Sequence, residues 1–137
     1  MTNKKSIKDC DVLGKAPKKK KQHEAQEQKT LFQWAKLQQC KYPELELMFA
    51  IPNGGSRHPI EARNLKLQGV KSGVLDIFLP VPKGNYYGFF LELKVGTNKL
   101  SDNQKWWCEK LEEQGYYIAV CYGFEEAKDM LIEYLSL

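Results

Sequence analysis

The sequence predicts an α/β domain in which a mixed β-sheet is flanked by helices, with the elements in the order α-β-α-β-β-α-β-α. Segments with apolar residues at helical spacing alternate with short apolar runs rich in β-branched and aromatic residues. Turn-forming residues separate these segments. The chain has no internal repeat, so all the elements are expected to belong to one fold.

The 137 residues divide into a basic tail over residues 1–22 and a domain over residues 23–137. Of the 21 Lys and Arg and 17 Asp and Glu, the tail carries eight lysines and two aspartates, which leaves 13 basic and 15 acidic residues for the domain. The tail also lacks apolar periodicity, which is typical of disorder. The remaining length is enough for a hydrophobic core of its own.

The first part of the domain is expected to form a helix, a strand and a second helix. Residues 23–40 place apolar side chains on one helical face. Residues 46–51 are a short apolar run that ends in a Pro-Asn-Gly-Gly turn, which predicts a strand. Pro59 suits the first position of a helix and Gly69 suits its end, so we expect the second helix between them.

Residues 73–79 and 86–94 predict a β-hairpin. Both are apolar runs, and the segment between them contains two prolines and Gly84, which predicts a turn. Folding the chain symmetrically about Gly84 places residue 76 opposite residue 92. The hairpin is therefore expected to bring two acidic side chains, Asp76 and Glu92, onto one face.

The last part of the domain is expected to form a helix, a strand and a closing helix. Ser101 and Gln104 match the Ser-x-x-Gln capping box, which predicts a helix that begins at Ser101 and ends at Gly115. Residues 116–122 are a dense apolar run typical of a strand. Residues 125–134 again have apolar side chains at helical spacing.

Asp76, Glu92 and Lys94 are the candidate catalytic residues. Opposed side chains on an antiparallel pair have Cβ atoms about 4.5–5.5 Å apart, and Lys94 shares their face because it lies two residues beyond Glu92. Two carboxylates and an ammonium suit binding of a divalent metal and activation of a water beside it. Charges on a hairpin are usually only its solvated face, but these strands are apolar on both faces, as buried strands are. A buried carboxylate is costly unless it is paired or coordinates a metal.

Three further polar residues have both a structural and a functional interpretation. Glu24 and Glu27 extend the apolar face of the first helix toward its start, where acids interact favourably with the helix dipole. The structural interpretation is preferred for each acid alone, although one of the two can reach the metal region. Gln104 completes the cap, and it also lies at the tip of a buried helix face near the end of the second hairpin strand.

Composition and patterning predict an intracellular protein without a membrane segment. The lysine-rich N-terminus is not followed by an apolar segment, and no apolar run is long enough to span a membrane. The four cysteines lack the spacing of a zinc ribbon or a disulfide framework. We therefore expect a location in the cytoplasm of a bacterial or phage-infected cell. The lysines at positions 18–21 have three interpretations, in order of preference a solvated tail, a DNA-contacting arm and a nuclear targeting signal, so a nuclear location stays open.

Four motifs follow one another along the chain in the order typical of one family. They are Ile51-Pro52-Asn53-Gly54-Gly55, Gly69-Val70-Lys71-Ser72-Gly73-Val74-Leu75-Asp76, Glu92-Leu93-Lys94 and Ser101-Asp102-Asn103-Gln104. Each motif is weak alone, but their order and spacing together resemble the virus-type replication-repair nuclease (VRR-NUC) domain of the PD-(D/E)XK nuclease superfamily. The resemblance covers residues 23–135.

The resemblance implies a restriction-endonuclease-like core and a deoxyribonuclease that hydrolyses phosphodiester bonds with Mg²⁺ or Mn²⁺. It assigns Asp76 and Glu92 as metal ligands, and we expect the Leu93 carbonyl and waters to complete the ligand set. Lys94 is expected to orient the attacking water and to offset charge in the transition state.

The resemblance also bears on three other positions. An acid of the first helix would complete the site, and Glu27 is preferred over Glu24 because it lies one turn before Leu31. Gln104 matches the family's glutamine after the catalytic strand. Leu75 stands where the family usually has proline, and we expect it to alter the entry of the strand without removing metal binding.

Stand-alone members of this family act as homodimers on branched DNA, so the resemblance implies a homodimer and four-way (Holliday) junctions as a substrate. Two sites related by a two-fold axis match the approximate symmetry of such a junction. Trp106, Tyr116 and Tyr134 are candidates for an apolar interface, although core packing is the preferred use of each. The rival hypotheses are a non-catalytic DNA-binding module with the same fold and a structural interaction domain. A binding module has no need for two acids near phosphates, so the Asp-Glu-Lys set favours the enzyme.

Overall fold

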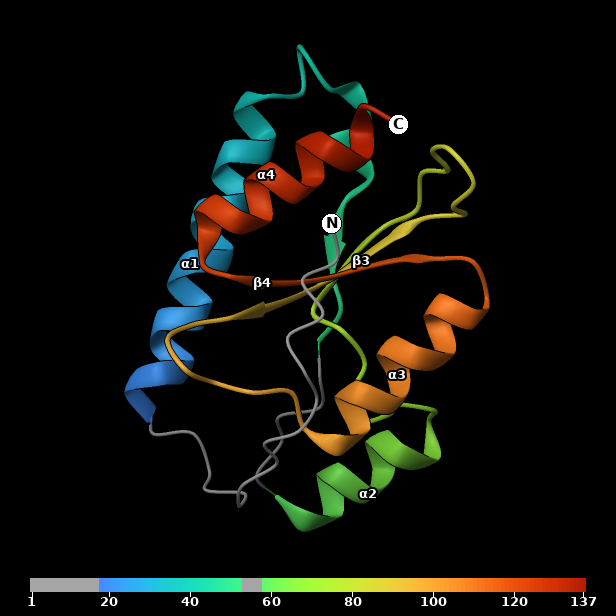
Figure 1. The fold of residues 1–137 in the computed structure, drawn as a ribbon. Helices are drawn as coiled ribbons and strands as arrows, with labels where there is room; N and C mark the ends of the chain where they lie inside the picture. Colours follow the sequence, from blue (N-terminus) through green and yellow to red (C-terminus); the bar gives the residue numbers. More distant parts are fainter. Residues whose placement is uncertain (1–17, 53–57) are drawn as a thin grey trace.

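The computed structural model describes residues 18–52 and 58–137, which form a four-stranded sheet with helices on both faces (Figure 1). Residues 1–17 of the predicted tail lie outside the described residues. The helices are α1 (Lys18–Leu37), α2 (Pro59–Leu67), α3 (Asp102–Glu113) and α4 (Phe124–Leu135), and a short 3₁₀ helix, η1, spans Pro43–Leu47. The strands are β1 (Phe49–Ala50), β2 (Ile77–Leu79), β3 (Phe89–Lys94) and β4 (Tyr117–Tyr122). Apart from η1, this is the order that the sequence predicts.

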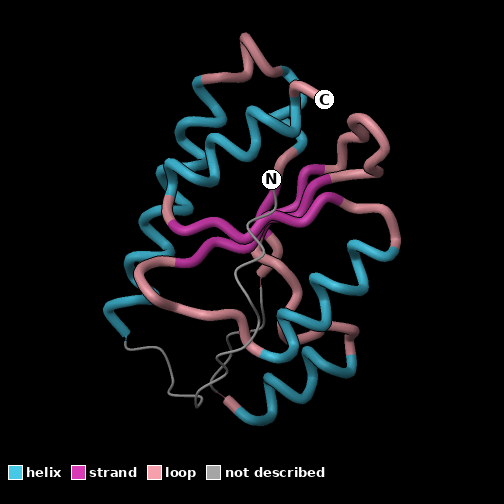
Figure 2. The backbone as a smooth tube through the Cα atoms, in the orientation of Figure 1, coloured by secondary structure: helices cyan, strands magenta, loops and turns pink. Residues whose placement is uncertain are grey.

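The sheet has the order β1-β2-β3-β4 and is mixed, as predicted. β1, β2 and β3 pair antiparallel, whereas β4 runs parallel to β3 after a crossover through α3. The strands form one layer between the helices (Figure 2). α1 and α4 pack together on one side of this layer, and α3 and α2 lie on the other (Figure 1). Within the described part of the chain, no helix combines the length and apolar character needed to cross a bilayer.

The register of the β2–β3 hairpin confirms the pairing expected from symmetry about Gly84. Ile77 pairs with Leu91, so one further step along the ladder places Asp76 opposite Glu92. β2 is shorter than the predicted strand, because the chain before it turns at Gly73, where φ is +84°.

Two elements differ from the sequence-based prediction at their boundaries. α1 begins at Lys18, five residues before the expected start, because lysine is a good helix former and no helix breaker lies between Lys18 and residue 23. The strand expected over residues 46–51 is wrong for Glu46 and Leu47, which belong to η1. Pro43 at the start of η1 favours a helical turn, and this turn buries Leu45 while Glu46 and Leu47 stay exposed.

Both faces of β3 are covered, and all six of its residues are buried. On one face, apolar side chains of β2, β3 and β4 pack against α1 and α4. These side chains are Ile77, Leu79, Phe89, Leu91, Leu93, Ala119 and Cys121, packed against Leu31, Ala35, Ala127, Leu131 and Tyr134. On the other face, the rings of Phe78 and Phe90 stack with their centroids 4.2 Å apart. The charged residues of β3 therefore lie in a buried strand, as the sequence predicts.

The three aromatic residues considered for an interface have different surroundings. Tyr134 is fully buried, and its hydroxyl donates a hydrogen bond to the Val81 carbonyl. Tyr116 packs edge-on against Phe90. Trp106 is 53% exposed on α3. Core packing is thus the use of Tyr134, whereas Tyr116 is partly buried and Trp106 is the most exposed of the three.

The loop after α2 is fixed to the first turns of α3. Ser72 accepts two hydrogen bonds from α3, one at its hydroxyl oxygen from the Asn103 amide at 2.9 Å and one at its carbonyl from the Trp107 indole at 3.1 Å. Gly73 lies so close to α3 that a Cβ built on it would be 2.5 Å from the Asn103 Cβ and 3.0 Å from the Gln104 nitrogen. This contact needs both a positive φ and the absence of a side chain, which glycine alone provides.

We expect Gly73→Ala to destabilise the fold more than Gly69→Ala. Gly69 also has a positive φ, +95°, but no atom lies within 4 Å of the place its Cβ would take. Backbone strain alone is expected to cost Gly69→Ala about 1–2 kcal/mol of unfolding free energy. Gly73→Ala adds a steric clash with α3 and should lose at least about 1 kcal/mol more. Urea denaturation measures both losses, and equal values would contradict the close approach at Gly73.

Candidate active site

The structure brings Asp76, Glu92 and Lys94 together on the side of the sheet that α3 covers. β3 carries Glu92 and Lys94 on one face, and the residue just before β2 is Asp76. The Lys94 ammonium lies 3.3 Å from Glu92 Oε1. Asp76 Oδ2 accepts a hydrogen bond of 3.0 Å from the main-chain N–H of Leu93, which fixes the carboxylate across the hairpin. The three candidate catalytic residues therefore form one cluster.

Gln104 joins this cluster from the first turn of α3 and contacts both the helix cap and the charged residues. Its Nε2 donates to Glu92 Oε1 at 2.7 Å, and its Oε1 accepts from Lys94 Nζ at 3.1 Å. The same Oε1 accepts from the Ser101 N–H at 2.9 Å and so completes the capping box. A carbonyl oxygen has two lone pairs, so one amide can cap the helix and hold the charged pair.

Glu92 is the residue of this cluster most in need of a cation. Its Oε2 is buried, and none of the described residues gives it a hydrogen bond. Burial and the nearby Asp76 carboxylate raise the pKa of Glu92 to about 8, against an ordinary value of 4.5. An unpartnered buried carboxylate oxygen is costly, and a bound cation would remove that cost.

The donor set fits a hard divalent ion. Burial also raises the pKa of Asp76, although the Leu93 N–H and the Lys94 charge oppose this shift. Among the described residues, no group of three or more His, Cys, Asp or Glu side chains is placed to hold a metal. Mg²⁺ is commonly bound by only one or two carboxylates and keeps several waters, so the Asp76–Glu92 pair suits it.

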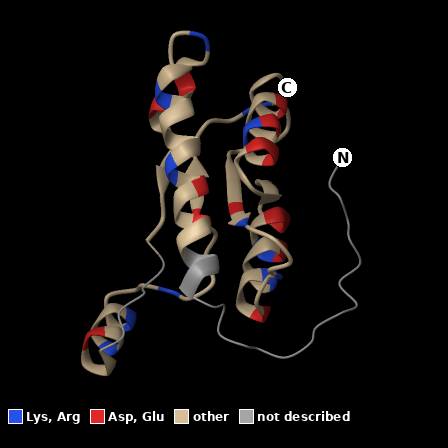
Figure 3. Cartoon of the chain, turned by 90° about the vertical axis from the view of Figure 1, so that its left-hand side faces the viewer, with Lys and Arg blue, Asp and Glu red and all other residues tan. Residues whose placement is uncertain are grey.

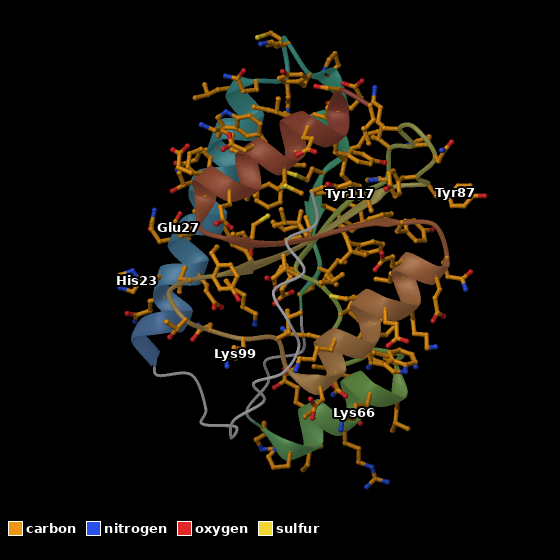
Figure 4. All side chains as sticks on the ribbon, viewed as in Figure 1. His23, Glu27, Lys66, Tyr87, Lys99 and Tyr117 are labelled. Atoms are coloured by element: carbon orange, nitrogen blue, oxygen red, sulfur yellow. The ribbon has the colours of Figure 1, made fainter. Side chains whose placement is uncertain are left out.

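Glu24 and Glu27, one turn apart on α1, have separate surroundings. Burial is the main cause of the raised pKa values of Asp76 and Glu92, and the negative charge of Glu24 adds to the shift of both. Glu27 Oε2 instead accepts a hydrogen bond of 2.8 Å from the N–H of Phe124, the first residue of α4. Figure 4 shows Glu27 beside the start of α4. Of the two acids, Glu27 is therefore engaged by α4, whereas Glu24 acts electrostatically on the carboxylate pair.

Two other positions considered from the sequence contribute to the core. The Leu75 side chain is fully buried, so this position helps to seat the strand that follows Asp76. The Leu93 side chain is also buried, on the face opposite the acids, so only its main chain can take part in the site.

One residue near the site, Asn98, was not predicted from the sequence to take part in it. The Asn98 amide donates a hydrogen bond of 2.8 Å to Glu24 Oε1. The two residues are 74 positions apart, and Asn98 belongs to a polar loop whose composition indicates only a turn. The contact could be found only once α1 had been placed beside that loop.

The comparisons with known proteins agree with this geometry. The sequence profile of the VRR-NUC domain matches residues 17–125. The chain belongs to the VRR-NUC domain family. A solved structure described as "VRR_NUC domain protein" superposes on it with a TM-score of 0.72 and 26% sequence identity, covering 82% of this chain and 88% of that one. The search of curated proteins found no match.

Membership of the VRR-NUC family places the chain among nucleases. This family acts on DNA and generally uses divalent metal ions, which agrees with the chemistry of the buried carboxylate pair. The mixed sheet with helices on both faces is also the fold expected from the family resemblance.

We expect the metal-free protein to lose stability as the pH rises from about 5 to about 8. The folded-state pKa of Glu92, about 8, exceeds its ordinary value of 4.5, so the folded state holds an extra proton between these limits. The unfolding free energy therefore falls as the pH rises through this range. Urea unfolding in EDTA at several pH values measures the slope.

Two variants test the assignment of this pH dependence to Glu92. Glu92→Gln removes the titrating group and is expected to flatten the slope, leaving a smaller contribution from Asp76. Glu113→Gln removes an exposed carboxylate of α3 and should keep the wild-type slope. A wild-type slope in Glu92→Gln would show that another group titrates.

Proposed function

We propose that this protein is a metal-dependent DNA endonuclease that hydrolyses phosphodiester bonds in branched DNA. The proposal is supported above all by the unpartnered, buried oxygen of Glu92 beside Asp76 and Lys94. A non-catalytic DNA-binding module would gain nothing from a carboxylate pair whose burial is costly without a cation.

Asp76 and Glu92, together with the main-chain carbonyl of Leu93, would hold Mg²⁺ or Mn²⁺, and Glu24 would supply the third acid. The bound ion would neutralise phosphate charge and lower the pKa of a coordinated water. Asp76 is already oriented for this role by the Leu93 N–H, and Glu92 by the Gln104 amide.

Lys94 orients the attacking water and offsets the negative charge that develops on the phosphate. Its ammonium is held by Glu92 Oε1 and by Gln104 Oε1, so it has a defined position before substrate binds. The side chain is only 11% exposed, and a charge in such a site acts more strongly than it would in water. Gln104 is a positioning residue in this scheme, because it acts on Glu92 and Lys94.

We expect Lys94→Ala to keep DNA binding and to lose cleavage by at least about 100-fold, since its role is confined to the transition state. Single-turnover cleavage with Mn²⁺ measures the rate, and fluorescence anisotropy with Ca²⁺ measures the binding. Lys110→Ala, which removes an exposed lysine of α3, is the control.

Three outcomes of this experiment are informative. Equal cleavage by Lys94→Ala and wild type would exclude the role of Lys94. Equal losses of binding and cleavage would assign Lys94 to DNA affinity alone. A wild-type protein that binds DNA but cuts none of several DNA forms with Mg²⁺ or Mn²⁺ would support the non-catalytic binding module.

We further propose a homodimer that nicks paired strands of a four-way junction. Each chain carries one site, and two sites related by a two-fold axis suit a substrate of the same approximate symmetry. Over residues 23–137 the 13 basic residues are outnumbered by 15 acidic ones, and the two kinds are interspersed along the described helices (Figure 3), so this part of one copy offers little basic surface for duplex DNA. Large apolar side chains available to an interface include Leu47, Phe49 and Trp106, which are about half exposed.

We expect light scattering at micromolar concentration to give about twice the chain mass of 15.9 kDa. Four-way junctions should be cut faster than linear duplex of the same sequence, because a dimer can engage two strands of a junction at once. A monomer that cuts both substrates equally would contradict the dimer and its substrate while leaving the nuclease activity in place.

A further inference from the structure

We propose that Asn98 is a positioning residue for Glu24 and that Tyr122 holds Asn98 in place for this purpose. The proposal rests on the proposed function, because it concerns the acid that α1 supplies to the metal site. It goes beyond that function by assigning the loop between β3 and α3 a role in arranging the third acid.

The described part of α1 around Glu24 makes few buried contacts, so the Glu24 carboxylate needs a partner to have a fixed position. Among the side chains of α1 that the structure describes, from residue 22 on, the first fully buried one is Leu31, two turns further along the helix. The side chains beside Glu24 are exposed, and Figure 4 shows His23 directed away from the sheet. Helix ends that bury little apolar surface open easily, so an acid there has no fixed position unless something binds it.

The Asn98 amide is suited to hold an acid that must also meet a cation. An ionised carboxylate only accepts hydrogen bonds, and the 2.8 Å contact supplies one N–H to Glu24 Oε1. The second carboxylate oxygen can then face another partner. A lysine in this place would neutralise Glu24 and compete with a metal ion, whereas the amide orients it without adding charge.

Asn98 is itself held through both its main-chain N–H and its main-chain carbonyl. Its N–H donates to the Val95 carbonyl at 3.2 Å, and its carbonyl accepts a 2.8 Å hydrogen bond from the Tyr122 hydroxyl. Tyr122 is the last residue of β4 and lies in register with Lys94 on β3. Its own N–H donates to Glu126 Oε2 in the first turn of α4 at 2.7 Å. The Glu24–Asn98–Tyr122 chain therefore connects α1 to the sheet at the level of Lys94.

The two acids of α1 thus have distinct roles in this arrangement. Glu27 binds the start of α4 through the Phe124 N–H and fixes the helix as a whole. Glu24 is bound by a loop that leaves the end of β3, so its position follows that of the strand carrying Glu92 and Lys94. A bond that only fastened a helix to a loop would affect stability, whereas a positioning bond also affects metal affinity.

Calorimetric titration of Mn²⁺ into the full chain tests the proposal without relying on cleavage. We expect Asn98→Ala to weaken Mn²⁺ binding about tenfold, as is typical when an outer partner of a ligand is removed. Tyr122→Phe removes only the hydroxyl and should weaken binding in the same direction by a smaller factor. Thr97→Ala changes an exposed neighbour on the same loop and should leave the affinity unchanged.

A double-mutant cycle shows whether Asn98 acts through Glu24. In a Glu24→Ala background, Asn98→Ala should cause no further loss of Mn²⁺ affinity, because the bond is already absent. Additive losses would overturn the proposal. So would a lower melting temperature of Asn98→Ala with wild-type Mn²⁺ affinity, since that result assigns the bond to stability alone. Should Asn98→Ala fail to fold, an unchanged Mn²⁺ affinity in Tyr122→Phe would overturn the proposal.

These results distinguish a failure of the role proposed for Asn98 from a failure of the proposed nuclease function. A wild-type protein that binds Mn²⁺ and cuts DNA, with an Asn98→Ala variant of equal affinity, would overturn the role of Asn98 alone. A wild-type protein that binds no Mn²⁺ would overturn both the metal-dependent nuclease and the positioning of Glu24.

Discussion

The burial of β3 on both faces is the constraint on which the rest of the structure depends. α1 and α4 cover one face and α3 covers the other, so water has little access to the charged residues of the strand. Glu92 and Lys94 must then find partners within the protein, and they find each other and Gln104. Even so, one oxygen of Glu92 has no partner among the described residues. The cost of this unpartnered oxygen is thus a consequence of the way this domain packs its central strand, and a bound cation would remove that cost.

The Gln104 amide connects the placement of α3 to the arrangement of the charged residues. It completes the cap of that helix through Ser101 and holds Glu92 and Lys94 at the same time. α3 cannot shift along the sheet without disturbing this pair, and the close approach of Gly73 to Asn103 and Gln104 also limits its movement. Packing of the helix and preorganisation of the site are therefore set by the same few contacts.

Local patterns were enough to predict the hairpin register, the cap at Ser101 and the order of the elements, because each depends on residues close in the sequence. The same patterns could not separate Glu24 from Glu27, which share one helical face one turn apart. That choice depends on where α1 lies relative to α4 and to the loop after β3. η1 was missed for a related reason, since only the packed core shows that the chain turns at Pro43 to bury Leu45.

α2 has no buried side chain, and within the described part of the chain it does not pack closely against another helix or strand. Ser72 and Gly73 fix the chain directly after it, so α3 keeps its place without contributions from the face of α2. Exposed substitutions away from such contacts usually change stability by no more than about 0.5 kcal/mol. The outer sequence of α2 is therefore free to diversify, and a new recognition surface could evolve or be engineered there while the cluster of Asp76, Glu92 and Lys94 stays intact.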